Sequence, residues 1–299
     1  MSTIQTNRKI NTRIAIHNVL ITTDFSEASK ASLPYAAALA EQFGAKVSMV
    51  HVLDPEPLLS VPLDPMPIED DRAWQDAEWN LVKFAHSGEL GDKPCKTVLA
   101  RGDFWTVIAG MIGKHKIDLV VTGSRGRKGL SRLALGSSAE KIYRRASCPV
   151  LTIGPNVRPP QDGEWKPKQI LFPTDGSETS LKALPYALSL AEENEAALII
   201  LQLEPLVFPE LRDSEETRTR EALRPLVPPD AEVWCKPEFV VRFQFPAEGI
   251  LELAKEREVD LIVMGVRKSS DTGMPDHLPW PVASRVVAEA PCPVLTVRG

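Results

Sequence analysis

Glycine and basic residues crowd one segment of the sequence. Residues 120–143 read VVTGSRGRKGLSRLALGSSAEKIY, an apolar run followed by Gly123, Gly126 and, after nine intervening residues, Gly136-Ser137. Glycine lets a backbone come close to a ligand and adopt positive φ without steric cost. A glycine-rich segment between a strand and a helix is typical of phosphate-binding loops. The segment therefore predicts an anion site.

The residues after these glycines predict the start of a helix. Ser137 and Glu140 have the spacing of a capping box. The amides of Ser137, Ser138 and Ala139 would then be free donors at the positive end of a helix dipole, and Arg125 with three further basic residues adds positive charge. The alternative is structural only: Ser137 caps its helix and the glycines shape the loop.

Sequence motifs of other enzyme and nucleotide sites are absent. The sequence has no GxxxxGK[ST], GxGxxG, GxSxG or HExxH pattern. Its five histidines are scattered, and no second acid is spaced with Asp24 for acid–base work or for holding a metal. The four cysteines form no CxxC pair and have no histidine at zinc-ligand spacing. We therefore expect no catalytic residue, no metal site and free, buried thiols.

Composition narrows the class of protein further. The chain has 299 residues, 43% of them hydrophobic and 25% charged, with a formal net charge of −5. This charge offers no global attraction for nucleic acid. No apolar run reaches the roughly 18 residues that span a bilayer, and the N-terminus lacks the apolar segment of a signal peptide. We expect a cytoplasmic protein with no membrane partner.

An internal repeat organises the chain. Residues 23–41 and 174–192 agree at 12 of 19 positions, and ASCPVLTI at 146–153 matches APCPVLTV at 290–297. Between the copies lies a segment rich in Pro, Gly and charge, which predicts an exposed linker. The predicted division is as follows: a first domain over 14–155, a linker over 156–167 and a second domain over 168–299.

Each copy alternates expected strands and helices. In the first copy the expected strands are 18–23, 46–53, 95–100, 118–122 and 149–153. Nearly continuous apolar strands that alternate with helices predict an α/β fold, with a doubly wound parallel sheet of five strands in each copy. Such sheets bind ligands at the carboxyl ends of their strands, where the winding reverses. Thr22-Thr23-Asp24 and Thr122-Gly123 occupy those ends.

These motifs together resemble the universal stress protein family. The resemblance rests on ITTDFSEAS, VSMVHVLD, DLVVTGSRG, the G-2x-G-9x-G-S spacing and SCPVLTI, and it covers nearly the whole chain as two tandem copies. It implies a flavodoxin/Rossmann-like sheet of order 3-2-1-4-5 in each copy. Terminal strands meet at the dimer contact in this family, so the resemblance implies an intramolecular pseudo-dimer and a further homodimer.

One branch of the family binds ATP through the glycine loop, and the first copy keeps that pattern. The resemblance therefore implies an ATP site, with or without Mg²⁺. It would be formed by Thr22, Thr23, Asp24, Val52, Thr122, Gly123, Arg125, Gly126, Gly136, Ser137 and Ser138. For Asp24 a local alternative stays open, because an Asp before a Ser-rich helix start often only closes a turn.

The second copy departs from this pattern. It keeps Asp175 and Gly265, but Trp280 and Pro281 replace Gly136 and Ser137. An indole would occupy the space of a bare backbone, and proline has no amide hydrogen to donate, although it suits the first residue of a helix. We therefore predict one ATP per chain, in the first domain. Trp280 either fills the vacated cleft or presents a surface to a partner.

Three functions remain open from the sequence. The first is an ATP-binding universal stress protein that reports nucleotide state to an unidentified protein partner. The second is a nucleotide-independent scaffold of the same fold. The third is a slow ATPase, for which the sequence offers little.

Overall fold

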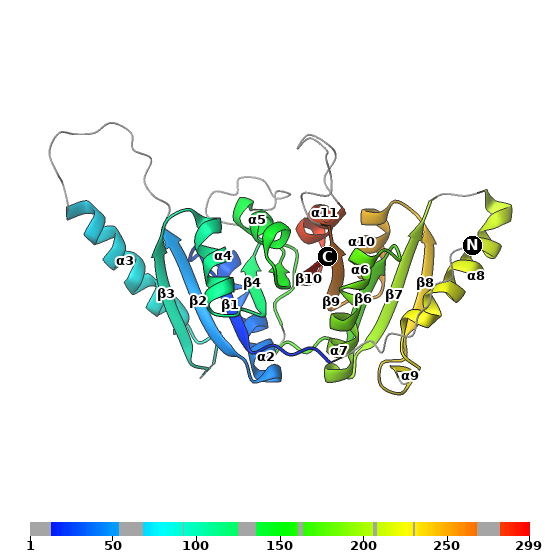
Figure 1. Cartoon of the computed structure of the whole chain (residues 1–299), viewed down its shortest axis with the longest axis horizontal. Coiled ribbons are helices and arrows are strands. Elements are labelled where there is room, and N and C mark those ends of the chain that lie inside the picture. Colours follow the sequence, from blue (N-terminus) through cyan, green and yellow to red (C-terminus); the bar gives the residue numbers. More distant parts are fainter. Residues whose placement is uncertain are drawn as a thin grey trace.

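The chain folds into two α/β domains that alternate strands and helices (Figure 1). The computed structural model describes residues 13–53, 68–91, 93–124, 136–160, 164–205, 208–229, 231–267 and 282–299. The first domain contains β1 (Asn18–Thr22), α1 (Glu27–Lys30), α2 (Leu33–Phe43), β2 (Lys46–Leu53), α3 (Ile68–Ala85), β3 (Cys95–Arg101), α4 (Phe104–Lys114), β4 (Leu119–Gly123), α5 (Ser137–Arg145) and β5 (Val150–Ile153). The second contains β6 (Gln169–Thr174), α6 (Glu178–Leu181), α7 (Leu184–Asn194), β7 (Ala197–Glu204), η2 (Pro209–Leu211), α8 (Arg212–Leu223), η3 (Arg224–Leu226), α9 (Ala231–Trp234), β8 (Glu238–Phe243), α10 (Pro246–Glu256), β9 (Leu261–Val266), α11 (Val282–Glu289) and β10 (Val294–Arg298).

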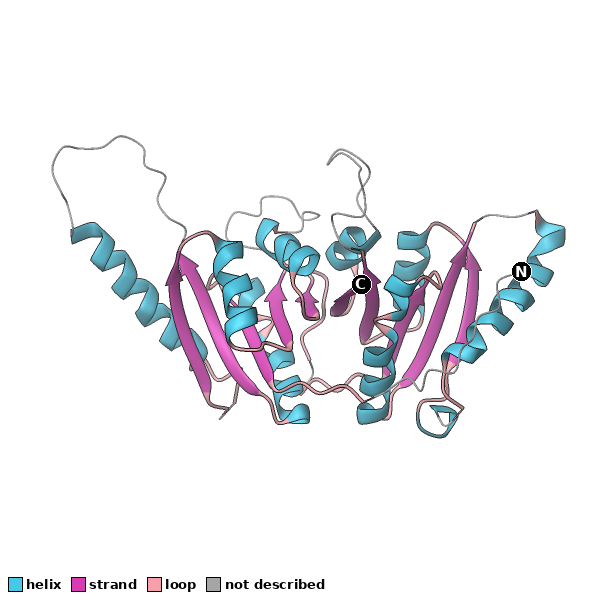
Figure 2. Ribbon diagram, viewed as in Figure 1, coloured by secondary structure: helices cyan, strands magenta, loops and turns pink. Residues whose placement is uncertain are grey.

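The two domains share one ten-stranded sheet (Figure 2). Its order is β3-β2-β1-β4-β5-β10-β9-β6-β7-β8, so each half has the expected order 3-2-1-4-5. Strands within each half are parallel, whereas β5 and β10 pair antiparallel with Leu151 opposite Leu295. Because these two edge strands pair with each other, their backbone N–H and C=O groups are not exposed for pairing with another chain. The predicted fold class and the intramolecular pseudo-dimer are confirmed.

Helices cover both faces of the sheet, because successive strand residues point to opposite sides. On one face a single apolar cluster runs through both domains and includes Ile21, Leu151 and Leu295, with residues of α2 and α7. On the other face there are two separate clusters, one beneath α4 and α5 and one beneath α10 and α11. The shared core therefore lies on one face, and on the other face Ala283 of α11 packs against both clusters.

The connecting segments also bind the domains together. The amide of Ile14 donates to Ser189 Oγ in the second domain at 3.2 Å. In the linker, the carbonyl of Arg158 accepts from Tyr35 Oη at 2.7 Å, and the Trp165 ring lies 5.2 Å from the Tyr35 ring in an edge-on arrangement. The linker was expected to be exposed. Trp165 is instead partly buried against the shared core, because its indole covers apolar surface of the first domain.

Two local features of α2 follow from its sequence. Pro34 lies in the first turn, where the missing amide hydrogen has no helical partner to lose, so it does not kink the helix. Gly44 ends the helix in the left-handed conformation at φ 61°, which glycine adopts without steric cost.

Candidate nucleotide site and the matching cleft of the second domain

The carboxyl ends of β1 and β4 lie next to each other, as the fold requires. Thr22 Oγ1 donates to Thr122 Oγ1 at 2.8 Å, and both residues are buried. Thr122 Oγ1 also lies 3.2 Å from the carbonyl oxygen of Gly123. Residues 100 positions apart in the sequence thus form one hydroxyl pair at the predicted ligand edge.

Asp24 organises the turn that follows β1. Its Oδ1 accepts hydrogen bonds from the Ser26 amide at 3.1 Å and from the hydroxyls of Ser26 and Ser29, each at 2.5 Å. Ser26 in turn is the N-cap of α1. The structure therefore gives Asp24 the local role that the sequence left open as an alternative, and its role toward adenosine stays a prediction.

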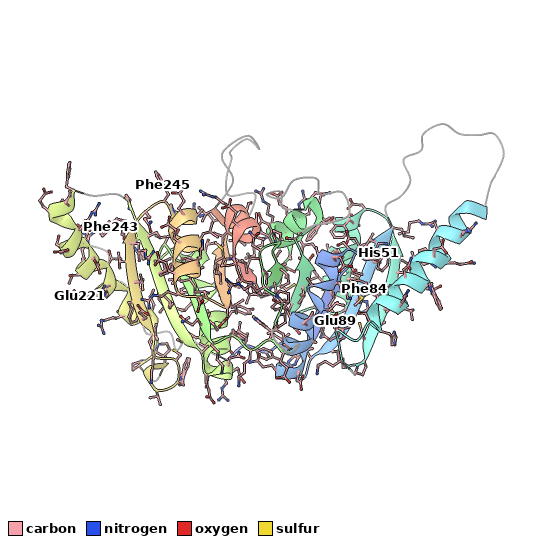
Figure 3. All side chains as sticks on the ribbon, turned by 180° about the vertical axis from the view of Figure 1, so that it is seen from behind. His51, Phe84, Glu89, Glu221, Phe243 and Phe245 are labelled. Carbon is pink, nitrogen blue, oxygen red and sulfur yellow. The ribbon has the colours of Figure 1, made fainter. Side chains whose placement is uncertain are left out.

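An aromatic group beside this turn was not predicted. Phe25 adopts positive φ (63°), and its ring centroid lies 4.3 Å from that of His51 and 5.8 Å from that of Phe84. Figure 3 shows His51 and Phe84 close together beside the strands of the first domain. A left-handed phenylalanine is strained by about 1–3 kcal/mol, and packing on two rings offsets that cost. The signal in the sequence was Phe25 at the position of Gly176, which has φ 72°.

Thr23 and Val52 lie at the end of β1 and on β2, and their roles toward a nucleotide stay predictions. Thr23 is buried, its amide donates to the Val50 carbonyl at 3.0 Å, and its Oγ1 accepts from the Phe25 amide at 2.9 Å. The carbonyl of Thr23 lies 2.7 Å from Nδ1 of His51, which makes this histidine a structural partner of the β1 turn. Val52 is half-buried on β2 and packs against the cluster beneath α4 and α5.

Gly123 is required by the packing of the fold. Its φ is not positive, and a Cβ at this position would lie 2.3 Å from the Ala28 carbonyl oxygen. No contact of a real Cβ is that short, so the backbone of α1 occupies the space that a side chain would need. The expectation of positive φ is therefore wrong for Gly123, and its role toward a ligand stays a prediction.

The helix after the glycine loop begins one residue earlier than the capping box requires. Gly136 is the N-cap of α5 and makes no side-chain cap bond, and Ser137 is the first helical residue. The capping-box prediction is wrong, because a residue inside the helix cannot cap it. The helix still offers donors: the first intrahelical bond runs from the Glu140 amide to the Gly136 carbonyl, and Ser137 and Ser138 are exposed ahead of it.

The remaining predicted loop residues are not covered. Arg125 and Gly126 lie outside the described residues, as do Trp280 and Pro281 of the second domain. At the edge of this gap, Ser124 is buried with 1% exposure, and its hydroxyl has no hydrogen-bond partner among the described residues. A hydroxyl pair, exposed helix-start amides and an unpartnered buried hydroxyl suit a phosphorylated ligand.

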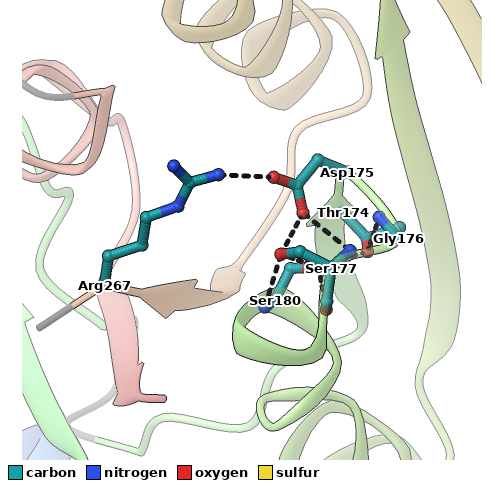
Figure 4. Close-up of polar contacts among 6 residues, drawn as sticks. All are labelled: Thr174, Asp175, Gly176, Ser177, Ser180 and Arg267. Carbon is teal, nitrogen blue, oxygen red and sulfur yellow. Dashed lines mark hydrogen bonds and ion pairs between the residues drawn. The ribbon is translucent and has the colours of Figure 1, made fainter. Parts of the chain in front are cut away.

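The second domain repeats the turn after its first strand. Asp175 Oδ1 accepts from the Ser177 amide at 3.0 Å and from Ser177 Oγ at 2.6 Å, while Oδ2 lies 3.5 Å from a guanidinium nitrogen of Arg267 (Figure 4). Partial burial raises the pKa of Asp175, but the hydrogen bonds from Ser177 and Ser180 outweigh it and hold this pKa below its ordinary value. Asp175 is therefore ionised and its charge is balanced locally.

A cavity of about 470 Å³ opens beside this turn. Its walls come from the ends of β6, β7 and β9, from α10 and α11, and from Tyr143 and Arg144 on α5 of the first domain. The sequence predicted that Trp280 would fill or cover this cleft, and that prediction falls outside the described residues. Elsewhere in the described part of the chain, no three His, Cys, Asp or Glu side chains gather as metal ligands would.

Membrane insertion finds no support in the helices. Among the residues that the structure describes, no helix is both long enough and apolar enough to cross a bilayer.

Comparison with known proteins identifies the family. The sequence profile of the universal stress protein family matches residues 15–154 and again 166–298. A universal stress protein of Mycolicibacterium smegmatis is 28% identical over 300 residues, covering 94% of this chain and 97% of its own. One of Methanocaldococcus jannaschii is 36% identical over 149 residues, covering 45% of this chain and 80% of its own. The crystal structure of a universal stress protein from Archaeoglobus fulgidus has the same fold (TM-score 0.71, 20% identity, 94% of this chain and 98% of that one). The chain therefore belongs to the universal stress protein family and carries two tandem copies of its domain.

Proposed function

We propose that the first domain binds one ATP, with or without Mg²⁺, and that the protein acts as a nucleotide-responsive regulatory module in stress. The observation that supports it most is the N-terminus of α5, where Ser137 and Ser138 are exposed ahead of the first helical hydrogen bond. Free amides at a helix N-terminus favour phosphate through direct donation and through the dipole.

The chain's own residues have distinct roles in this proposal. The amides of Ser137 and Ser138 hold phosphate oxygens, and the buried hydroxyl of Ser124 provides a donor at the start of the loop. Thr22 and Thr122 fix the ends of β1 and β4 through their mutual bond. Arg125 and Gly126 complete the loop in the proposal carried over from the family resemblance. Mg²⁺, when bound, supplies charge neutralisation to the phosphates.

The test transplants the second domain's residues into the first. The double variant G136W/S137P keeps the fold, because Gly136 has φ −64° and Ser137 is the first helical residue, where proline is tolerated. It removes one amide donor and places an indole over the helix start. We expect one ATP per wild-type chain by isothermal titration, and at least tenfold weaker binding in the variant, which is ~1.4 kcal/mol.

A matched control is available in the second domain. V282W changes the first residue of α11, the counterpart of Ser138, and should leave ATP binding intact. If wild type binds no ATP, the nucleotide role is lost and the nucleotide-independent scaffold takes its place. We propose no catalytic role; linear phosphate release that D24A abolishes would instead establish a slow ATPase.

We also propose that the protein forms a homodimer, binds an unidentified protein partner and is cytoplasmic. Sedimentation of the full chain tests the homodimer.

A further inference from the structure

The cleft of the second domain differs chemically from its counterpart in the first domain. At four matched positions a hydroxyl side chain of the first domain is replaced by an apolar one. The pairs are Thr22 and Pro173, Thr122 and Met264, Ser124 and Val266, and Ser138 and Val282. All four apolar members line the 470 Å³ cavity. The groups that suit a phosphorylated ligand in the first domain have thus become an apolar wall.

Apolar residues form much of the remaining wall, to which hydroxyl groups are added by Tyr143, Thr174, Ser177, Thr179 and Ser180. Leu201, Leu203 and Ile250 line the cavity from β7 and α10. A volume of about 470 Å³ lies within the range of roughly 300–1,000 Å³ that small-molecule sites occupy. Burial of apolar ligand surface contributes about 25 cal/mol per Å² to the free energy of binding. This wall therefore favours a ligand with a hydrocarbon body.

The lining of the cavity also contains charged residues. Its charged lining residues are Asp175, Arg267 and Arg144. Asp175 is already engaged: Oδ1 by Ser177 and Oδ2 by Arg267. Arg144 pairs with Glu140 on its own helix at 3.1 Å. A guanidinium group has five N–H donors, so Arg267 and Arg144 can each donate to a ligand carboxylate as well as to their present partners. A cationic ligand would need an acceptor, and both oxygens of Asp175 are already engaged.

Both domains build this site. Tyr143 and Arg144 belong to α5, and the Tyr143 hydroxyl lies 2.5 Å from Ser284 Oγ on α11, with both residues buried. Figure 1 shows α5 and α11 side by side at the centre of the molecule. An isolated second domain would lack one wall of the cavity and one of the two guanidinium groups.

We propose that this cavity binds a small, phosphate-free monocarboxylate with an apolar body, such as a medium-chain fatty acid. The carboxylate head lies at the mouth on Arg267 and Arg144. The hydrocarbon body lies against Leu203, Ile250, Met264 and Val282. This site is separate from the proposed ATP site and does not depend on it.

The first measurement compares three ligands with one tail. Full-length protein is titrated calorimetrically with octanoate, 1-octanol and octylamine. We expect octanoate to bind once per chain, octanol to bind at least tenfold more weakly because it lacks the charged head, and octylamine to bind more weakly still. No octanoate binding, or octylamine binding as tightly as octanoate, overturns the proposal.

Variants then locate the site. R267Q removes one of the two partners of the carboxylate head. The Arg267 side chain is 65% exposed, so the fold is kept, and octanoate affinity should fall toward that of octanol. V282W, also at an exposed position, should block octanoate and spare ATP, whereas S138W should block ATP and spare octanoate. Octanoate binding that is unchanged in R267Q and V282W places the ligand elsewhere and refutes the site. Loss of ATP binding alone leaves this result untouched, so the two proposals fail separately.

Discussion

Replacing Gly123 with alanine tests whether this glycine is required by the fold. The added Cβ would lie 2.3 Å from the Ala28 carbonyl oxygen and 2.6 Å from its carbonyl carbon. Contacts of real Cβ atoms essentially never fall below 3.0 Å, so α1 and the end of β4 must separate by at least 0.7 Å. The obstacle is backbone, which cannot rotate away as a flexible side chain would.

The energetic cost follows from that displacement. Overpacking a well-packed interior costs about 1–3 kcal/mol. Helix α1 also carries Ser29, whose hydroxyl holds Asp24, and Ser26, its N-cap. A destabilisation of this size lowers the melting temperature by about 2–4 °C for each kcal/mol in a chain of a few hundred residues. We therefore expect G123A to melt about 2–12 °C below wild type.

A matched pair of glycine variants makes the assay decisive. Gly113 lies inside α4 with no heavy atom within 4 Å of its would-be Cβ, so G113A should stabilise the protein by about 0.5–1 kcal/mol. G265A in the second domain should act as G123A does, because its Cβ would lie 2.4 Å from the Thr179 carbonyl oxygen. Both are measured by urea unfolding. A G123A protein as stable as G113A would refute the reasoning.

The remaining predictions concern the domain seam and the thiols. Removing the Tyr143 hydroxyl by Y143F should cost about 1–3 kcal/mol, because the buried Ser284 hydroxyl then loses this partner. S284A should cost less, because Arg144 also bonds the Tyr143 hydroxyl; a double-mutant cycle in urea without coupling would contradict the pairing. Burial raises the pKa of Cys95 to about 11 and those of Cys148 and Cys235 to about 12, from an ordinary 9.0. The folded state thus favours the protonated thiols, and their stabilisation is intact below about pH 9 and is lost as the pH rises toward 12. C148A should reduce that alkaline loss in urea unfolding, and an unchanged pH dependence would exclude this thiol as its source.

The fold was largely accessible from the sequence. Strand and helix periodicity with the repeat at 23–41 and 174–192 predicted the two α/β domains, and the resemblance supplied the strand order. Where the sequence failed, it failed locally. The capping box at Ser137 was one residue out of place, and the linker residue Trp165 proved to be packed against Tyr35. Such details depend on contacts between segments that are distant in the sequence, and a local sequence pattern cannot predict those contacts.

The candidate site also has features that the sequence predicts and features that only the tertiary structure shows. By itself the sequence determined that a glycine loop and a Ser-rich turn follow the first and fourth strands of the first domain, because periodicity and turn chemistry are local properties. Only the tertiary structure decided what those residues face. It placed Gly123 against Ala28 and closed Asp24 onto Ser26 and Ser29. It also brought α5 of the first domain over a cavity of the second. The physical reason is that the contacts of a residue depend on how segments from the whole chain pack in three dimensions. A local sequence pattern does not contain that information.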